Sequence, residues 1–365
     1  MTKGAGLGPV VVGLSSRGKL SRLAGLIVEE QGADVRYLHL VLSPKVNAVF
    51  GFDSSDFNPT AWAKSRSKNF HELDLTKESD SWLESEGARS FGQFWTPDLR
   101  GLFDSEFLLP RLVAWARSQN ISTVSTGHRA RITLESERDY SLWRSRDIEH
   151  DQSAWLAQGG AKLFSSLLLP LGYLKLGELE KLCVLHEISP QGVSLVDEET
   201  RMMDFSKIRG TIDTRSLSRV KQKGYIIDEA RNVVGDHDGL INFYPGAPQT
   251  SSASSMLALG CDLMKQWLIV VPAEKLAATN ACLTARAQWC TTKPKLFTSN
   301  EIFDLQVGFK AAEFGKARAK ILIDSMLRLE KVSDADTFPF PNGRRITLYR
   351  GAQCLGSAQV LESYR

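Results

Sequence analysis

Two apolar runs near the start of the chain constrain the fold most, because each is typical of a buried strand and a helical stretch lies between them. The runs cover residues 9–14 and 35–42. Between them, after a turn at residues 15–18, apolar side chains from Leu20 to Ile27 recur at helical spacing. This order of strand, turn, helix and strand predicts an α/β domain with a doubly wound parallel sheet.

The same order returns further along the chain. Residues 109–119 have the pattern of a helix and residues 121–125 that of a strand, and the tripeptide Thr-Gly-His follows at 126–128. In parallel sheets of this kind, ligands bind outside the carboxyl ends of the strands. We therefore expect the turn at 15–18 and the turn at 126–128 to face one cleft.

The chain changes character after about residue 200. A basic segment from Lys207 to Lys223 precedes a strand-like run at Tyr225, which indicates a small central domain. From Gln266 onward, short apolar runs such as 267–271 alternate with turn residues, as in a small β-barrel or sandwich. We predict three domains, at residues 1–203, 204–262 and 263–365.

Composition narrows the class of protein. The 365 residues are 42% hydrophobic, with a net charge of +3 that is too small to indicate nucleic-acid binding by the whole molecule. No run of about 18 uncharged apolar residues occurs and the first residues lack the layout of an export signal, so we expect a cytoplasmic protein with no membrane partner. The five cysteines include no Cys-x-x-Cys pair, which argues against a disulfide framework or a metal site and favours core thiols.

The segment between the first strand and the first helix is a candidate phosphate loop. Such a loop can hold phosphate because its N–H groups and the helix dipole point at the ligand. This one fits neither the Walker pattern nor the dinucleotide-binding glycine pattern, so an ordinary turn is the alternative. The candidate contacts are Gly13, Leu14, Ser15, Ser16, Arg17, Gly18, Lys19 and Leu20.

Five separated stretches carry a resemblance to a known family. Residues 126–132 read Thr-Gly-His-Arg-Ala-Arg-Ile, residues 150–153 His-Asp-Gln-Ser, and residues 169–172 Leu-Pro-Leu-Gly. Residues 234–240 contain Gly-Asp-His-Asp-Gly, and residues 349–356 read Tyr-Arg-Gly-Ala-Gln-Cys-Leu-Gly. In order and spacing, the chain resembles the bacterial tRNA-specific 2-thiouridylase family, MnmA, of the PP-loop ATP pyrophosphatase group.

The resemblance implies a PP-loop domain of the adenine nucleotide alpha hydrolase-like type, a small central tRNA-binding domain and a C-terminal β-barrel. In the family, ATP adenylates the wobble uridine of tRNA, and a cysteine persulfide then delivers sulfur while AMP leaves. The implied cofactor is ATP, and the implied partner is tRNA or another structured RNA. We leave room for a protein partner and expect no DNA.

The chain departs from the family at the positions that carry the chemistry. Relative to the family loop Ser-Gly-Gly-Val-Asp-Ser-Ser, Ser16 and Arg17 replace the glycines and Lys19 replaces the aspartate, and a lysine does not hold magnesium. Gly101 stands where the resemblance puts the resolving cysteine, and Ser194 where it puts the sulfur carrier. Neither residue forms a persulfide or a disulfide, so we predict no intact catalytic residue and no metal site.

The resemblance also carries over binding contacts. Nucleotide contacts would add Leu40 and Gly127 to the loop, and Arg17 and Lys19 admit a different reading as a static phosphate site without turnover. The RNA contacts would be Thr96, Pro97, Asp98, His128, His150, Asp151, Gln152, Gln288, Trp289 and Arg344. Three hypotheses stay open: an RNA-binding pseudoenzyme, a thiouridylase with altered chemistry, and a protein-assembly scaffold that binds neither RNA nor nucleotide.

Overall fold

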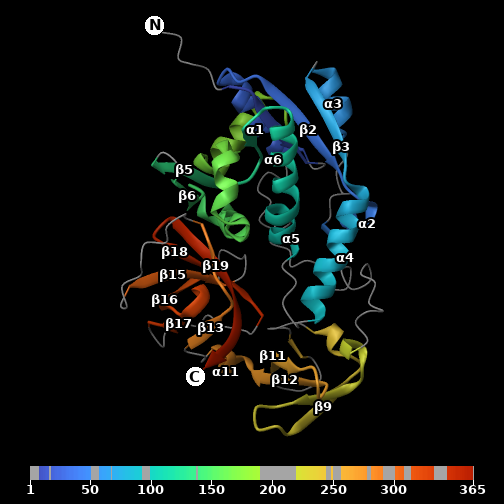
Figure 1. Ribbon diagram of the computed structural model, residues 1–365, viewed down its shortest axis with the longest axis vertical. Helices are drawn as coiled ribbons and strands as arrows, with labels where there is room; N and C mark the ends of the chain where they lie inside the picture. Colours follow the sequence, from blue (N-terminus) through green and yellow to red (C-terminus); the bar gives the residue numbers. More distant parts are fainter. Residues whose placement is uncertain are drawn as a thin grey trace.

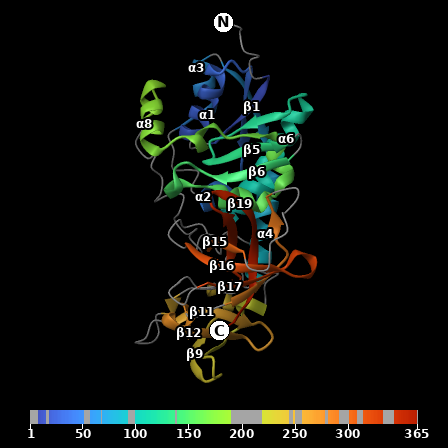
Figure 2. The same ribbon diagram turned by 90° about the vertical axis from the view of Figure 1, so that its left-hand side faces the viewer.

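The chain forms three sheets that follow one another along the long axis of the molecule (Figures 1 and 2). The computed structural model describes residues 8–15, 18–50, 57–66, 68–92, 99–136, 139–189, 219–243, 248–249, 256–277, 281–290, 301–307, 314–332 and 343–364. A parallel sheet lies at one end, a small middle sheet at the other, and a large antiparallel sheet between them. None of the described helices is long and apolar enough to cross a membrane.

The parallel sheet has the strand order β3-β2-β1-β4-β7. Its strands are β1 (Val10–Leu14), β2 (Val35–Val41), β3 (Asn69–Asp74), β4 (Thr123–Ser125) and β7 (Leu167–Leu168). Every pairing within it is parallel. The predicted α/β fold is therefore confirmed, and the three strands expected from the sequence are present.

Helices cover both faces of this sheet, which explains why β1 is apolar at nearly every position. Val11 belongs to a core cluster with Leu112 of α6 (Leu109–Ser118), whereas Val10 and Val12 pack with Val28 of α1 (Lys19–Glu30). The other α-helices among the described residues of this half of the chain are α2 (Pro44–Phe50), α3 (Pro59–Ser65), α4 (Thr76–Gly92), α5 (Leu99–Leu102), α7 (Ser153–Leu156) and α8 (Leu176–Leu185).

A π-helix, η2 (Phe103–Leu108), joins α5 to α6, so residues 99–118 form one continuous helical segment. The sequence predicted only the second half of it. π-helical turns are rare and occur often at functional sites. This one carries part of the polar cluster described below.

The middle sheet has the strand order β10-β11-β12-β8-β9. Its strands are β8 (Gly224–Ile227), β9 (Val233–His237), β10 (Pro248–Gln249), β11 (Met256–Asp262) and β12 (Trp267–Pro272). The run at 267–271, assigned to the barrel from the sequence, is β12 and pairs with β11 and β8, so that assignment was wrong. Alternating apolar residues identify a strand but not its partner, and the predicted boundary at 262 falls between two paired strands.

The C-terminal part closes into a six-stranded antiparallel β-barrel, as predicted. Its strands are β13 (Ala281–Thr284), β15 (Ile302–Val307), β16 (Phe314–Ile321), β17 (Leu327–Lys331), β18 (Arg345–Arg350) and β19 (Gln353–Tyr364). The sheet closes because β13 pairs with β17 on one side and with β19 on the other. Buried Ala317, Ala319 and Leu329 contribute to a core of its own.

A hairpin from the N-terminal half extends the same sheet. It consists of β5 (Ala130–Ser136) and β6 (Asp139–Arg144), and β6 pairs with β19 through Leu142 opposite Cys354. The sequence did not predict this hairpin. Figure 2 shows it between the parallel sheet and the barrel, so the two domains share a continuous sheet.

Candidate functional site

The candidate phosphate loop forms hydrogen bonds among its own residues. Gly18 caps α1 with φ 65°, a left-handed conformation that favours glycine. The Ser15 N–H donates to Ser21 Oγ at 3.1 Å, and the Gly18 N–H donates to Ser15 Oγ at 3.3 Å. Two N–H groups that could face a phosphate are therefore already satisfied by hydroxyls of the loop.

A neighbouring aromatic ring covers the same turn. A Cβ added to Gly18 would lie 2.1 Å from a ring carbon of Phe57, so the ring fills the space beside the loop. The Arg22 Nε donates to the Gly18 carbonyl at 3.0 Å, and its guanidinium lies 4.2 Å from the Phe57 ring centroid. Arg22 and Phe57 thus fix the turn from the side of the helix.

The described part of the loop does not fit magnesium and ATP. The first turn of α1 holds no acidic residue to bind the metal and begins with Lys19. Leu40 is 7% exposed and packs in the main core cluster, so its side chain is not presented to a ligand. Ser16 and Arg17 lie outside the described residues.

The Thr-Gly-His turn lies against this loop, as its position after β4 led us to expect. A Cβ added to Gly127 would lie 2.8 Å from the backbone carbon of Leu20 and from the backbone nitrogen of Ser21. Only a glycine allows the end of β4 to approach the first turn of α1 so closely. The carboxyl ends of β1 and β4 therefore meet at one edge of the sheet.

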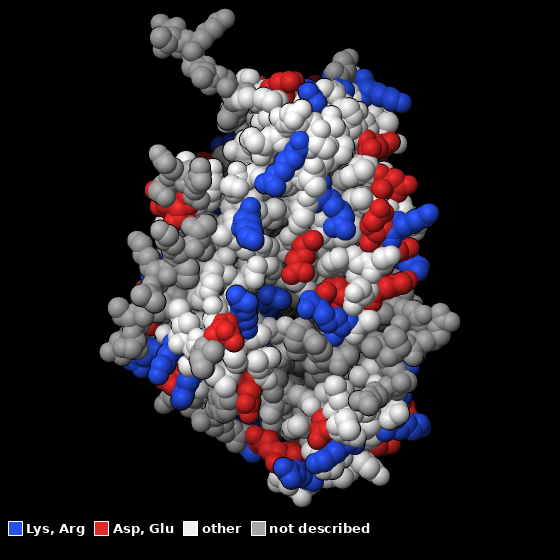
Figure 3. Space-filling view, in the orientation of Figure 1, with Lys and Arg blue, Asp and Glu red and all other residues white. Residues whose placement is uncertain are grey.

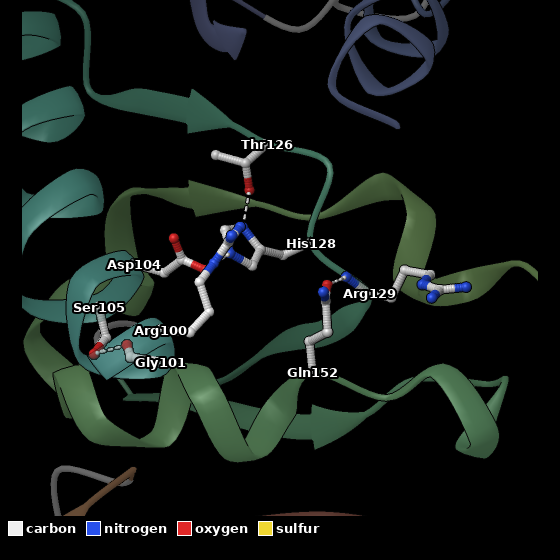
Figure 4. Close-up of polar contacts among 8 residues, drawn as sticks. All are labelled: Arg100, Gly101, Asp104, Ser105, Thr126, His128, Arg129 and Gln152. Carbon is white, nitrogen blue, oxygen red and sulfur yellow. Dashed lines mark hydrogen bonds and ion pairs between the residues drawn. The ribbon is translucent and has the colours of Figure 1, made fainter. Parts of the chain in front are cut away.

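A polar cluster extends from this turn to the π-helix (Figure 4). The Nδ1 of His128 lies 2.9 Å from Thr126 Oγ1, and its Nε2 lies 3.6 Å from Asp104 Oδ2. Arg100 Nε donates to the same oxygen of Asp104 at 3.1 Å. Both contacts are made by the tautomer whose Nε2–H faces Asp104 and whose Nδ1 accepts a hydrogen bond from the Thr126 hydroxyl.

Asp104 is charged although it is only 2% exposed. Burial by itself would raise the pKa of its carboxyl, but Arg100 and His128 outweigh that effect and hold the pKa below its usual value. Neither this residue nor Arg100 was predicted from the sequence, because both lie in a largely apolar helical stretch. Their four-residue spacing, a common distance for ion pairs on a helix, was the one signal available.

Gly101 lies inside this cluster, on the helical turn between Arg100 and Asp104 (Figure 4). It is buried, and its carbonyl accepts the Ser105 hydroxyl at 2.7 Å. The position at which the resemblance puts the resolving cysteine thus lies beside an ion pair and carries no side chain. Ser194, Thr96, Pro97 and Asp98 lie outside the described residues, as do residues 207–218 of the basic segment.

The side chains of residues 150–152 lie against other residues of the protein and make their contacts there. His150 is 5% exposed, with Nδ1 3.1 Å from Asp147 Oδ2. Asp151 accepts the Ser145 N–H at 2.7 Å and the Ser153 hydroxyl at 2.6 Å, and burial raises its pKa to about 6. The Oε1 of Gln152 accepts the Arg129 N–H at 2.8 Å, which holds the Thr-Gly-His turn in place.

The remaining candidates, Gln288, Trp289 and Arg344, belong to the barrel. Gln288 and Trp289 form the short strand β14 (Gln288–Trp289), which pairs with β19, and Arg344 precedes β18. The Gln288 amide lies against Gly160, where a Cβ would be 2.6 Å from its nitrogen. Gly159, next to it, lies against Ser105 of η2, so this glycine pair links the barrel to the helix that carries Gly101.

The thiols are placed as core residues. Cys183, Cys282, Cys290 and Cys354 are buried, and Cys290 Sγ lies 3.8 Å from Cys354 Sγ. Burial raises the pKa of the Cys183, Cys282 and Cys354 thiols and raises that of Cys261 to about 12. Among the described residues, no group of three or more histidine, cysteine or acidic side chains could hold a metal ion.

Comparison with known proteins finds a matching family and several similar proteins. A model described as the tRNA methyl transferase HUP domain matches residues 9–189. The chain is 24% identical over 258 residues to the tRNA-specific 2-thiouridylase MnmA of Trichormus variabilis, covering 69% of this chain and 70% of that protein. It is 27% identical over 256 residues to the MnmA of Chloroflexus aurantiacus, covering 67% of each. A solved structure described as a predicted subunit of tRNA methyltransferase from Methanocaldococcus jannaschii aligns with a TM-score of 0.21 and 15% identity over 50% of this chain and 90% of that one, too low to bear on the fold.

Proposed function

From the premise that this chain belongs, through residues 9–189, to the tRNA methyl transferase HUP domain family, we propose that it is a tRNA-binding member of the MnmA type that does not transfer sulfur. The relatives named above carry the name of a tRNA-specific thiouridylase, which supports tRNA as the partner. Binding and sulfur transfer are separate properties, because they depend on different side chains. In this proposal the chain has retained tRNA binding and has lost sulfur transfer.

Gly101 is the observation that most directly supports the proposed loss of sulfur transfer. Sulfur transfer through a persulfide and a disulfide needs thiolates that can approach each other. Gly101 is buried beside the Arg100–Asp104 ion pair, and as a glycine it has no thiol. Cys183, which packs near α1, is a core thiol whose pKa burial raises, so it is a poor substitute.

The phosphate loop supports the same conclusion for ATP. Family members of the PP-loop group use ATP, but here Ser15 and Ser21 occupy loop N–H groups, and the Phe57 ring covers Gly18. With Lys19 where the metal-binding acid would be, the described part of the loop offers magnesium no carboxylate. We propose that the chain neither adenylates uridine nor depends on ATP for binding.

His128, Gln288, Trp289 and Arg344 remain the proposed RNA contacts among the described residues. The Thr126 hydroxyl and the Asp104 carboxylate fix the ring of His128, so it would meet RNA in one orientation at little entropic cost. Residues 150–152 would act indirectly, by holding the turn that carries His128. The domain boundary at residue 203 stays a proposal as well, whereas the boundary at 262 is not proposed again because it separates β11 from β12.

Two measurements on the full chain test the proposed function. Crosslinking of bound RNA followed by sequencing should enrich tRNA over its share of cellular RNA. Incubation with ATP, magnesium and bulk tRNA should release no pyrophosphate above a reaction without protein. Release that depends on tRNA would favour a thiouridylase with altered chemistry. A failure to enrich any RNA would favour a scaffold instead.

A further inference from the structure

The outer face of the barrel carries a row of cations. On β16, Ala317 and Ala319 point into the barrel core, and Lys316, Arg318 and Lys320 alternate with them and are exposed. Because alternate residues of a strand are about 6.7 Å apart on one face, these three cations form a regular line. Figure 3 shows Lys and Arg side chains gathered at the lower left edge over β16 and β17, and in Figure 2 these strands face the viewer.

Few acidic side chains balance the positive charge of this row. Arg328 of β17 lies directly opposite Lys320, and like charges in opposite positions destabilise a sheet. Glu330 lies opposite Arg318 but forms its ion pair with Arg328, at 2.8 Å. Asp304 of β15 is opposite Lys316. Within the described part of the chain, Lys316, Arg318 and Lys320 make no salt bridge.

We propose that this row, Lys316, Arg318, Lys320 and Arg328, is a binding surface for the phosphate backbone of RNA. The proposal rests on the proposed function, because it names where the barrel contacts the RNA. A line of exposed cations, of which only Arg328 has an acidic partner among the described residues, complements a regular polyanion, whereas an acidic protein segment would need apolar contacts as well. Ile302, 46% exposed beside Arg318, is the large apolar side chain next to the row.

Backbone contacts of this kind position RNA without reading its sequence. Lysine and arginine both bind phosphate oxygens, and each phosphate neutralised releases counterions into the solution. Each such contact steepens the dependence of log Kd on log salt by about 0.7 to 0.9. The surface would therefore contribute affinity and orientation, and the choice of RNA would come from other contacts.

The test compares two triple variants of the full chain by fluorescence anisotropy with labelled bulk tRNA at several salt concentrations. The first is Lys316→Gln, Arg318→Gln and Lys320→Gln. The matched control is Lys64→Gln, Lys162→Gln and Lys181→Gln, three exposed cations of the N-terminal domain with the same change of charge. Outward glutamines leave the barrel core intact, and circular dichroism checks the fold of both variants.

The barrel variant should bind tRNA at least about tenfold more weakly near 0.1 M salt, with a slope lower by about 2 to 3, while the control keeps most of its affinity. Equal losses in the two variants would mean general electrostatics and overturn the inference. So would an unchanged barrel variant, which would leave the proposed function standing. Absence of tRNA binding by the unmodified chain would overturn both.

Discussion

The contributions of Asp104 and Asp151 to the stability of the folded chain change with pH in opposite directions. Asp104 is held charged by Arg100 and His128, so the pKa of its folded form lies below the unfolded value near 4. The stability it contributes is present above that pH and is lost as the pH falls through the folded pKa. Asp151 has a folded pKa of about 6, so the folded chain takes up a proton between about pH 4 and 6 and loses stability as the pH rises through that window.

We therefore expect Asp151→Asn to be more stable than the unmodified chain at pH 7.5, by about 2 kcal/mol, and equal to it near pH 4. An asparagine keeps the oxygen that accepts the Ser145 N–H and offers Ser153 a donor in place of an acceptor. Urea unfolding at a series of pH values measures the difference.

Asp104→Asn serves as the contrast, because it leaves the Arg100 guanidinium without a carboxylate. It should destabilise the protein at pH 7.5 by about 1 to 3 kcal/mol. If both variants changed stability in the same direction at that pH, the assigned charge states would be wrong.

The turn between β1 and α1 depends on the Phe57 ring as much as on its own backbone. Gly18→Ala should cost about 1 to 2 kcal/mol for the left-handed conformation and more for the contact with Phe57, giving a total of about 2 to 4 kcal/mol. Gly32→Ala is the matched control, because Gly32 also has a positive φ, 85°, but nothing lies within 4 Å of its added Cβ. It should show the backbone cost alone.

A double-mutant cycle with Phe57→Ala separates the two parts of that cost. In the Phe57→Ala background, Gly18→Ala should cost no more than Gly32→Ala does. Thermal or urea unfolding of the four chains gives the coupling. No coupling between positions 18 and 57 would mean that the ring does not cover the turn.

Local patterns predicted the elements that form an apolar run or a helical periodicity of their own. Strands β1, β2 and β4 and helix α6 follow from runs and periodicity, and both Gly127 and the loop were found because a strand ends beside them. The β5–β6 hairpin was missed because its pairing with β19 joins positions far apart in the chain. Asp104 was missed because an acid in a largely apolar helical segment resembles a solvent-facing residue until its partners, Arg100 and His128, are known.

The molecule is held together by one core that crosses its sheets. The largest cluster of buried residues includes Val11 of the parallel sheet, Leu142 of the hairpin, Tyr349 of the barrel and Leu268 of the middle sheet. Tyr349 is fully buried and its hydroxyl lies 3.1 Å from Ser153 Oγ, so a barrel side chain bonds into the N-terminal half. A shared core of this kind favours unfolding as a unit.

Tyr349→Phe should lower the free energy of unfolding by about 0.5 to 1.5 kcal/mol, for the lost hydroxyl contacts with Ser153 and Gln306. Tyr349→Ala should lower it by about 3 to 5 kcal/mol, because a large cavity is left. In both variants, urea unfolding followed by tryptophan fluorescence and by circular dichroism should give coincident single transitions. Two separate transitions in the unmodified chain would show that the sheets unfold independently.

The pairing of β6 with β19 has a consequence for how the chain folds as it is made. β6 ends at Arg144, and the strand that pairs with its open edge, β19, begins only at Gln353. At about 5 to 20 residues per second, roughly 200 residues of synthesis leave the edge of β6 without its partner for about 10 to 40 s. During that time the N-terminal half exposes an open strand edge to other nascent chains, and the edge closes only once β19 has left the ribosome.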